Sequence, residues 1–220
     1  MANLIKIAIA GEGGQGVQSI AEILAEAANE AGKNALYIPN FGVEQRGGVS
    51  IAYVQISDEA IGFPKFQKAD ILIPVSTRAV ERTAMYAGKD TIYIYDNSLV
   101  DYNDVNKEVV GNKFFDVTPA NLGTDNVAVN GDKANKNLSE VNTLIAIPAN
   151  DIAKNELHPR VFNIIILGAV IAATEVLPLD RIKEALESKL GAKFEANPKL
   201  REMNFNALER GYELIKGAIK

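Results

Sequence analysis

Six residues near the start of the chain, GEGGQG, have the types and spacing of an anion-binding loop. Gly11, Gly13 and Gly16 fit the pattern G-x-G-x-x-G, between an apolar run and a segment with helical spacing. Glycines allow a tight turn and let backbone N–H groups approach a ligand, and the N-terminus of the following helix attracts negative charge. The segment predicts binding of a phosphate-type anion; the plainer alternative is a tight strand-to-helix connection.

The same loop lacks the additional residues that mark a dinucleotide site or a Walker loop. A dinucleotide site usually has an acidic residue at the end of the second strand, where this chain reads Tyr-Ile-Pro-Asn at residues 37–40. No Lys-Ser or Lys-Thr pair follows the glycines, so the loop is not a Walker loop. Glu12 places a carboxylate near the turn, which disfavours a pyrophosphate there and leaves an interface role as the alternative.

A second glycine-rich segment, NFGVEQRGGVS at residues 40–50, holds Arg46 between polar and glycine neighbours. A guanidinium suits bidentate contact with a carboxylate or a phosphate, although it could equally bond loop carbonyls. In the first loop, the Gln15 amide either faces a ligand or caps its own helix. The two segments supply the candidate cofactor-binding residues Gly11, Gly13, Gly14, Gln15, Gly16, Arg46, Gly47 and Gly48.

Apolar runs alternate with amphipathic segments along the chain. We expect strands at residues 4–10, 34–38, 49–56, 69–75, 91–95 and 143–147, with short ones near 114–117 and 126–129. We expect helices at about 17–31, 77–86, 160–174, 179–190 and 197–216, with irregular structure over most of 99–141. This order predicts an α/β fold, a three-layer αβα Rossmann-like arrangement with a mostly parallel sheet, in one domain over residues 1–220.

The composition excludes several classes of function. Lys and Arg number 23 against 28 Asp and Glu, and a net charge of −5 disfavours nucleic-acid binding. With no Cys and one His, the chain cannot hold a disulfide, a thiolate zinc site, a cysteine nucleophile or a cysteine-ligated iron–sulfur cluster. No targeting segment is visible, and the longest apolar stretch, residues 164–173, is too short to span a bilayer. We therefore expect a soluble, cytoplasmic protein without membrane contact.

Taken in order, the motifs resemble those of the gamma subunit of the 2-oxoacid:ferredoxin oxidoreductase family. The glycine motif alone is weak, but the ordered set is specific and covers most of the chain except residues 99–141. The set consists of GEGGQG at 11–16, VEQRGGVS at 43–50, KADILIPV at 68–75, IPANDIAKNEL at 147–157, FNIIILGAVIAAT at 162–174 and NFNALERGYEL at 204–214.

The resemblance implies a place in a larger enzyme. The family converts a 2-oxoacid and coenzyme A into an acyl-CoA, carbon dioxide and reduced ferredoxin. Thiamine diphosphate and iron–sulfur clusters do the chemistry in other subunits, so we expect this chain to bind no cofactor firmly, to hold no catalytic residue or metal, and to be inactive alone. The implied partners are alpha, beta and ferredoxin-like delta subunits, and coenzyme A.

Several alternatives stay open from the sequence. The chain could instead be a stand-alone Rossmann-like nucleotide-binding module, and in isolation it could form a homodimer through surface meant for its partners. Pyruvate, 2-oxoglutarate, branched-chain and aryl 2-oxoacids are all open as substrates. Asp96 follows a strand end, where turn formation is the favoured interpretation, and His158 is favoured as a surface or capping residue.

Overall fold

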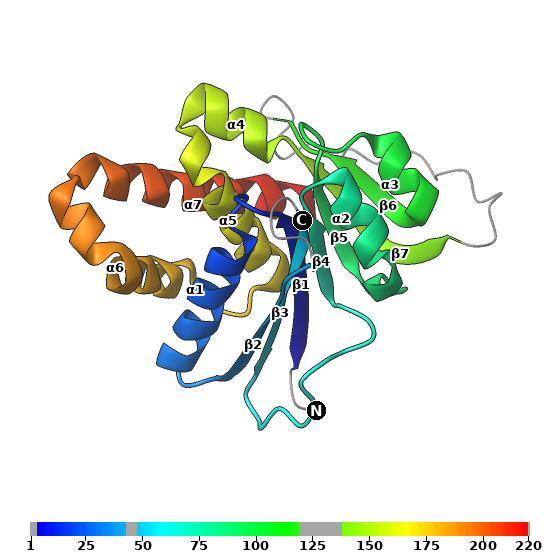
Figure 1. Ribbon diagram of the computed structural model, residues 1–220, viewed down its shortest axis with the longest axis horizontal. Coiled ribbons are helices and arrows are strands. Elements are labelled where there is room, and N and C mark those ends of the chain that lie inside the picture. Colours follow the sequence, from blue (N-terminus) through cyan, green and yellow to red (C-terminus); the bar gives the residue numbers. More distant parts are fainter. Residues whose placement is uncertain (1–3, 43–47, 119–137, 220) are drawn as a thin grey trace.

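A seven-stranded sheet runs through the centre of the chain, with helices on both faces (Figure 1). The structure is a computed structural model, and it describes residues 4–42, 48–118 and 138–219. The strand order is β2-β3-β1-β4-β5-β7-β6. The strands are β1 (Ile5–Glu12), β2 (Asn34–Asn40), β3 (Val49–Ser57), β4 (Ile71–Pro74), β5 (Ile92–Asp96), β6 (Val109–Asp116) and β7 (Ser139–Ile147).

Only β3 runs against its neighbours in the sheet. It pairs antiparallel with both β1 and β2, while the β1–β4, β4–β5, β5–β7 and β6–β7 pairs are parallel. The expected mostly parallel α/β sheet is therefore confirmed. Because β3 is reversed, the residues that lead into it lie at the same edge of the sheet as the residues that leave β1.

Helices cover the two faces of the sheet unequally. The longer ones pack mainly on one face: α1 (Val17–Glu30), α5 (Phe162–Thr174), α6 (Leu179–Ala196) and α7 (Pro198–Ile219). The other face carries α2 (Thr77–Thr83), the short 3₁₀ turn η1 (Ala84–Tyr86) and α3 (Tyr102–Glu108). At the carboxyl edge of the sheet, β7 leads into α4 (Ala149–Glu156) and the 3₁₀ turn η2 (Pro159–Val161).

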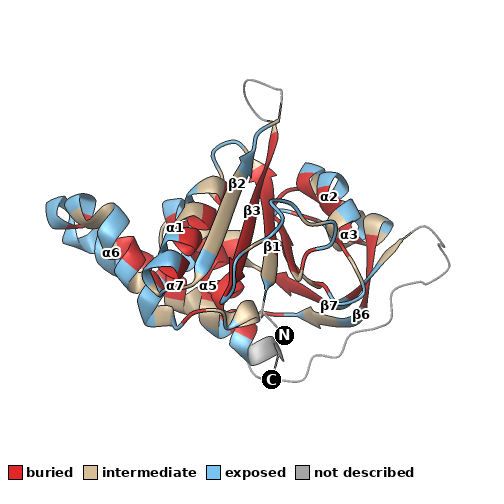
Figure 2. Cartoon of the chain, turned by 90° about the horizontal axis from the view of Figure 1, so that it is seen from below, coloured by how far each residue is buried: buried red, intermediate tan, exposed pale blue. Residues whose placement is uncertain are grey.

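Burial follows from the alternation of side chains along the strands. In β3, Ala52, Val54 and Ile56 face the α1 side, while Ile51 and Tyr53 face the α2 side. Figure 2 shows the buried strands between the two helical layers. Burial on both faces explains why the strands read as near-continuous apolar runs in the sequence.

The closest helix contact joins α5 to α7 through two glycines. A Cβ added at Gly168 would overlap the backbone oxygen of Leu208, and one at Gly211 would overlap that of Ile165. The two backbones therefore touch at this crossing, as only glycine permits. The predicted buried helix at 160–174 is present as η2 followed by α5, and all of its residues from Phe162 to Ile171 except Asn163 are buried.

The structure differs from the sequence expectation mainly in the polar central region. Residues 99–141 contain α3, the whole of the eight-residue strand β6 and the start of β7, where mostly irregular structure was expected. The helix expected at 179–190 continues to Ala196. Gly11 and Glu12 belong to β1, so the turn itself begins at Gly13. The short strand expected at 126–129 lies outside the described residues.

The glycine crossing gives a stability prediction with a matched control. We expect Gly168→Ala to lower the free energy of unfolding by at least about 2 kcal/mol, because the methyl group has to displace backbone atoms of α7. Gly191, in the middle of α6, has no atom within 4 Å of an added Cβ. Gly191→Ala should raise the free energy of unfolding by about 0.5 to 1 kcal/mol, since alanine favours a helix. Urea denaturation measures the free energy of unfolding of both variants. Equal changes in the two variants would refute the close contact between α5 and α7.

Candidate functional site

Two glycine-rich segments that are far apart in the sequence meet at the carboxyl end of β1. In the β1–β3 ladder, Glu12 lies opposite Val49 and Gly11 opposite Ser50. Gly48, directly before β3, therefore lies beside the turn that follows β1. Of the predicted residues in the second segment, only Gly48 is described, while Arg46 and Gly47 lie outside the described residues.

The turn between β1 and α1 leaves backbone groups accessible. Gly14 and Gly16 have positive φ values of 98° and 75°, which glycine adopts without strain. Gly16 is the N-cap of α1, and no side chain caps that helix. Gly13 and Gly14 are exposed. The unpaired N–H groups of the first helical turn can therefore contact an anion.

The Gln15 side chain ties the turn to the neighbouring strand β4. Its Oε1 accepts a hydrogen bond from the Glu12 N–H at 2.6 Å, and its Nε2 donates to the Val75 carbonyl at 3.0 Å. A Cβ added at Gly11 would lie 2.6 Å from both Gln15 Oε1 and Val75 Cγ2. The amide is therefore packed between the ends of β1 and β4, and it does not cap α1.

These residues surround the topological switch point of the sheet. The helix after β1 covers one face and the helix after β4 covers the other, and ligands of open α/β sheets usually bind at such a point. The Gln15 amide occupies the space directly between the two strand ends. Open surface at this edge therefore lies above the glycine turn and on the α2 side.

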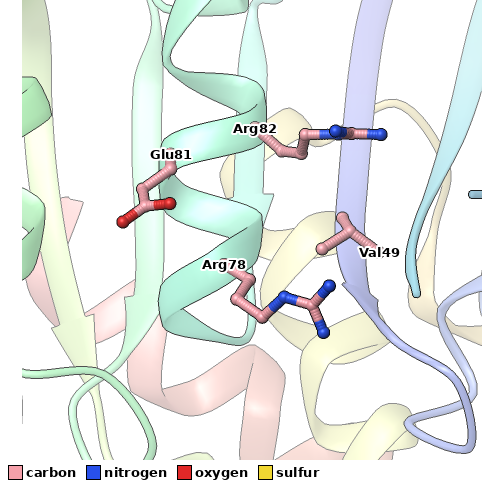
Figure 3. Close-up of a pocket in the computed structure, with 4 residues that line it drawn as sticks. All are labelled: Val49, Arg78, Glu81 and Arg82. Carbon is pink, nitrogen blue, oxygen red and sulfur yellow. The ribbon is translucent and has the colours of Figure 1, made fainter. Parts of the chain in front are cut away.

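Two arginines that the sequence reasoning missed lie on that α2 side. Arg78 and Arg82 are one helical turn apart, and they line a cavity of about 220 Å³ with Glu81 and Val49. Figure 3 shows both guanidinium groups extending toward the Val49 side, while Glu81 points away from it. Two guanidinium groups that flank one cavity can bind a doubly charged anion such as a phosphate.

Asp96, at the carboxyl end of β5, has a structural role. Its carboxylate is fully buried; Oδ1 accepts from the Ser98 N–H at 2.8 Å and from the Ser98 hydroxyl, and Oδ2 accepts from the Asn150 N–H at 2.8 Å. Burial raises the pKa of this carboxyl group above its usual range. These bonds form a turn and satisfy the first turn of α4. His158 likewise caps η2, because its Nδ1 accepts from the Arg160 N–H at 3.1 Å.

Metal-binding and membrane-spanning features are lacking in the part of the chain that the structure describes. No group of three or more His, Cys, Asp or Glu side chains there could hold a metal ion. None of the described helices combines the length and the apolar character needed to cross a membrane.

Known proteins match this chain over nearly its whole length. The family model described as pyruvate ferredoxin/flavodoxin oxidoreductase matches residues 6–214. The pyruvate/ketoisovalerate oxidoreductases common subunit gamma of Thermococcus kodakarensis is 32% identical over 92% of this chain and 96% of its own. The 2-oxoglutarate synthase subunit KorC of Methanocaldococcus jannaschii is 31% identical over 96% of this chain and 94% of its own.

A solved structure has the same fold. It is that of pyruvate oxidoreductase subunit PORC from Thermotoga maritima, which superposes with a TM-score of 0.68 at 24% identity, over 96% of both chains. Some longer relatives match this chain over only 36% to 37% of their own length. In those proteins the matching region is one part of a larger polypeptide.

The packing of Gln15 gives a prediction about the carboxyl edge. We expect Gln15→Met to lower the free energy of unfolding by about 1 to 3 kcal/mol, because the Glu12 N–H and the Val75 carbonyl lose their partner. Gln67→Met is the control, since Gln67 is exposed and makes no hydrogen bond to another described residue. Thermal denaturation compares the two variants. If Gln15→Met left the free energy of unfolding unchanged, the two hydrogen bonds of Gln15 would not stabilise the fold, and its amide would instead serve a ligand.

Proposed function

We propose that this chain, which belongs to the pyruvate ferredoxin/flavodoxin oxidoreductase family, is the gamma subunit of a multi-subunit 2-oxoacid:ferredoxin oxidoreductase. The observation that carries the proposal is the family match, which extends over residues 6–214. Relatives of full length are named as pyruvate, ketoisovalerate and 2-oxoglutarate enzyme subunits. These names support a 2-oxoacid as the substrate class, but they do not select one of the three 2-oxoacids.

The assembled enzyme would decarboxylate the 2-oxoacid and transfer the acyl group to the thiol of coenzyme A. Carbon dioxide is the other product, and the released electron pair passes to ferredoxin. Thiamine diphosphate and the iron–sulfur clusters would be held by the alpha, beta and ferredoxin-like delta subunits. This division agrees with the sequence, because a chain without Cys cannot ligate a cluster through thiolates.

The contribution of this chain is then binding and orientation of coenzyme A at the glycine-rich edge. Coenzyme A carries several phosphate groups, which need cationic or N–H partners. Glu12 disfavours a phosphate on the turn itself, whereas Arg78 and Arg82 offer two guanidinium groups beside Val49. We assign the phosphates to the α2 side of the edge and leave the turn around Gly13 and Gly14 for the uncharged part of the ligand.

Assembly is the first test of this proposal. We expect the tagged chain to co-purify from its native lysate, under anaerobic conditions, with a thiamine-binding subunit and a cysteine-rich ferredoxin-like chain. The complex should reduce ferredoxin with a 2-oxoacid and coenzyme A, and the isolated chain should not. Activity of the isolated chain would refute the proposal. Tight binding of NAD(H) or NADP(H) by the isolated chain, with no partner recovered, would favour the stand-alone nucleotide-binding module.

The arginine pair gives a kinetic prediction for the complex. We expect Arg78→Gln combined with Arg82→Gln to raise the KM for coenzyme A about tenfold and to leave kcat within about twofold, because binding is lost but chemistry is not. Arg181→Gln is the matched control, an exposed arginine on α6 that bonds Glu184 at 2.8 Å. A fall in kcat at constant KM would instead place the pair near the reacting groups, and no change would remove it from the coenzyme A site.

A further inference from the structure

A second cavity lies on the opposite face of the sheet from α2, among α1, η2, α5, α6 and α7. Its volume is about 400 Å³, which falls in the range of small-molecule sites, roughly 300 to 1,000 Å³. It is the larger of the two cavities described here. None of its lining residues belongs to the coenzyme A site proposed above.

The floor of this helical pocket is apolar. Ile23 from α1 and Ile164 from α5 are each 3% exposed, and both belong to the main hydrophobic core. Leu190 and Leu200, from α6 and α7, are half-buried and complete the apolar wall. A ligand that fills this floor would gain free energy from burying an apolar body.

The rim of the pocket is cationic. Arg160, from η2, and Lys193, from α6, are exposed, and neither has an acidic partner within the described residues. Lys189, the third cation of the lining, is already paired with Glu22 Oε2 at 2.9 Å and Glu26 Oε1 at 3.1 Å. Two cations from different elements therefore remain available at the mouth of the pocket for an anion.

Two amide side chains give the pocket further polar character. Asn204 is 5% exposed; its Nδ2 donates to the Leu200 carbonyl at 2.7 Å, and no described residue donates to its Oδ1. Asn163 also lines the cavity, and its Nδ2 would lie 2.6 Å from a Cβ added at Gly16. The Asn204 amide oxygen, which has no donor among the described residues, can accept a hydrogen bond from a ligand hydroxyl or N–H group.

We propose that this helical pocket binds a small organic anion with an apolar body, its acidic group held by Arg160 and Lys193 and its body on the apolar floor. The acidic group can be a carboxylate or a phosphate, which guanidinium and ammonium groups both recognise. This inference does not depend on the function proposed above. It concerns a second ligand, and Asn163, which lines the pocket, also packs on Gly16 of the glycine turn.

Binding of defined probes to the full chain tests the proposal. The probes are 4-methylvalerate and n-butyl phosphate as anions with apolar bodies, 4-methylvaleramide as the neutral counterpart and acetate as the anion without a body. We expect saturable amide shifts in NMR spectra around residues 160–164 and 189–193 with at least one of the first two. The amide and acetate should bind about tenfold more weakly. Tighter binding of the carboxylate indicates an organic acid, and tighter binding of the phosphate indicates a phosphate ester.

Variants at the rim separate the pocket from general surface charge. Arg160→Gln combined with Lys193→Gln should weaken the better probe about tenfold. Lys199→Gln should leave its affinity unchanged, because Lys199 is an exposed cation outside the lining. Circular dichroism and thermal denaturation verify that each variant is folded. Absence of saturable binding, equal affinity for the neutral amide, or unchanged affinity in the double variant would overturn the proposal, whatever the outcome of the assembly experiment.

Discussion

One half-buried side-chain amide, that of Gln15, connects the turn after β1 to the end of β4, and the carboxyl edge of the sheet depends on that connection. The amide satisfies a backbone donor and a backbone acceptor at once. It fits there because Gly11 has no side chain, since an added Cβ would collide with it. With the two strand ends held together, α1 and α2 begin at fixed positions on opposite faces. The glycine turn and the two arginines of α2 are thereby presented at one edge.

The two faces of the sheet have different chemical character. The α2 side presents arginines beside the glycine-rich edge, whereas the opposite side encloses an apolar pocket with a cationic rim. Asn163 belongs to the pocket and also packs on Gly16, so it is in contact with both sites. A ligand in the pocket would thus contact Asn163, and Asn163 in turn contacts the glycine turn at Gly16.

Local patterns predicted those parts of the fold that local physics decides. An apolar run predicted the first strand, six residues with four glycines predicted the turn, and helical spacing predicted the helix that follows. The apolar character of α5 on all sides predicted that it is buried. Arg78 and Arg82 escaped notice because two arginines one turn apart on a helix usually form a solvated face. Only the β1–β3 register, which places Val49 opposite Glu12, brings the start of β3 to the edge where they lie. The helical pocket escaped for a similar reason, since α1, α5, α6 and α7 contribute to it from distant parts of the chain.

The reversed strand β3 also bears on the order in which the chain assembles. Its ladder with β2 closes only a short loop, beginning with Asn40 opposite Ile51, whereas its ladder with β1 spans the whole of α1 and β2. Closing a short loop costs less entropy, and contacts between residues close in sequence form faster. The β2–β3 hairpin is therefore expected to form early and to dock on β1 afterwards. The edge that gathers the two glycine segments would then be completed only after the hairpin has fixed the position of Gly48.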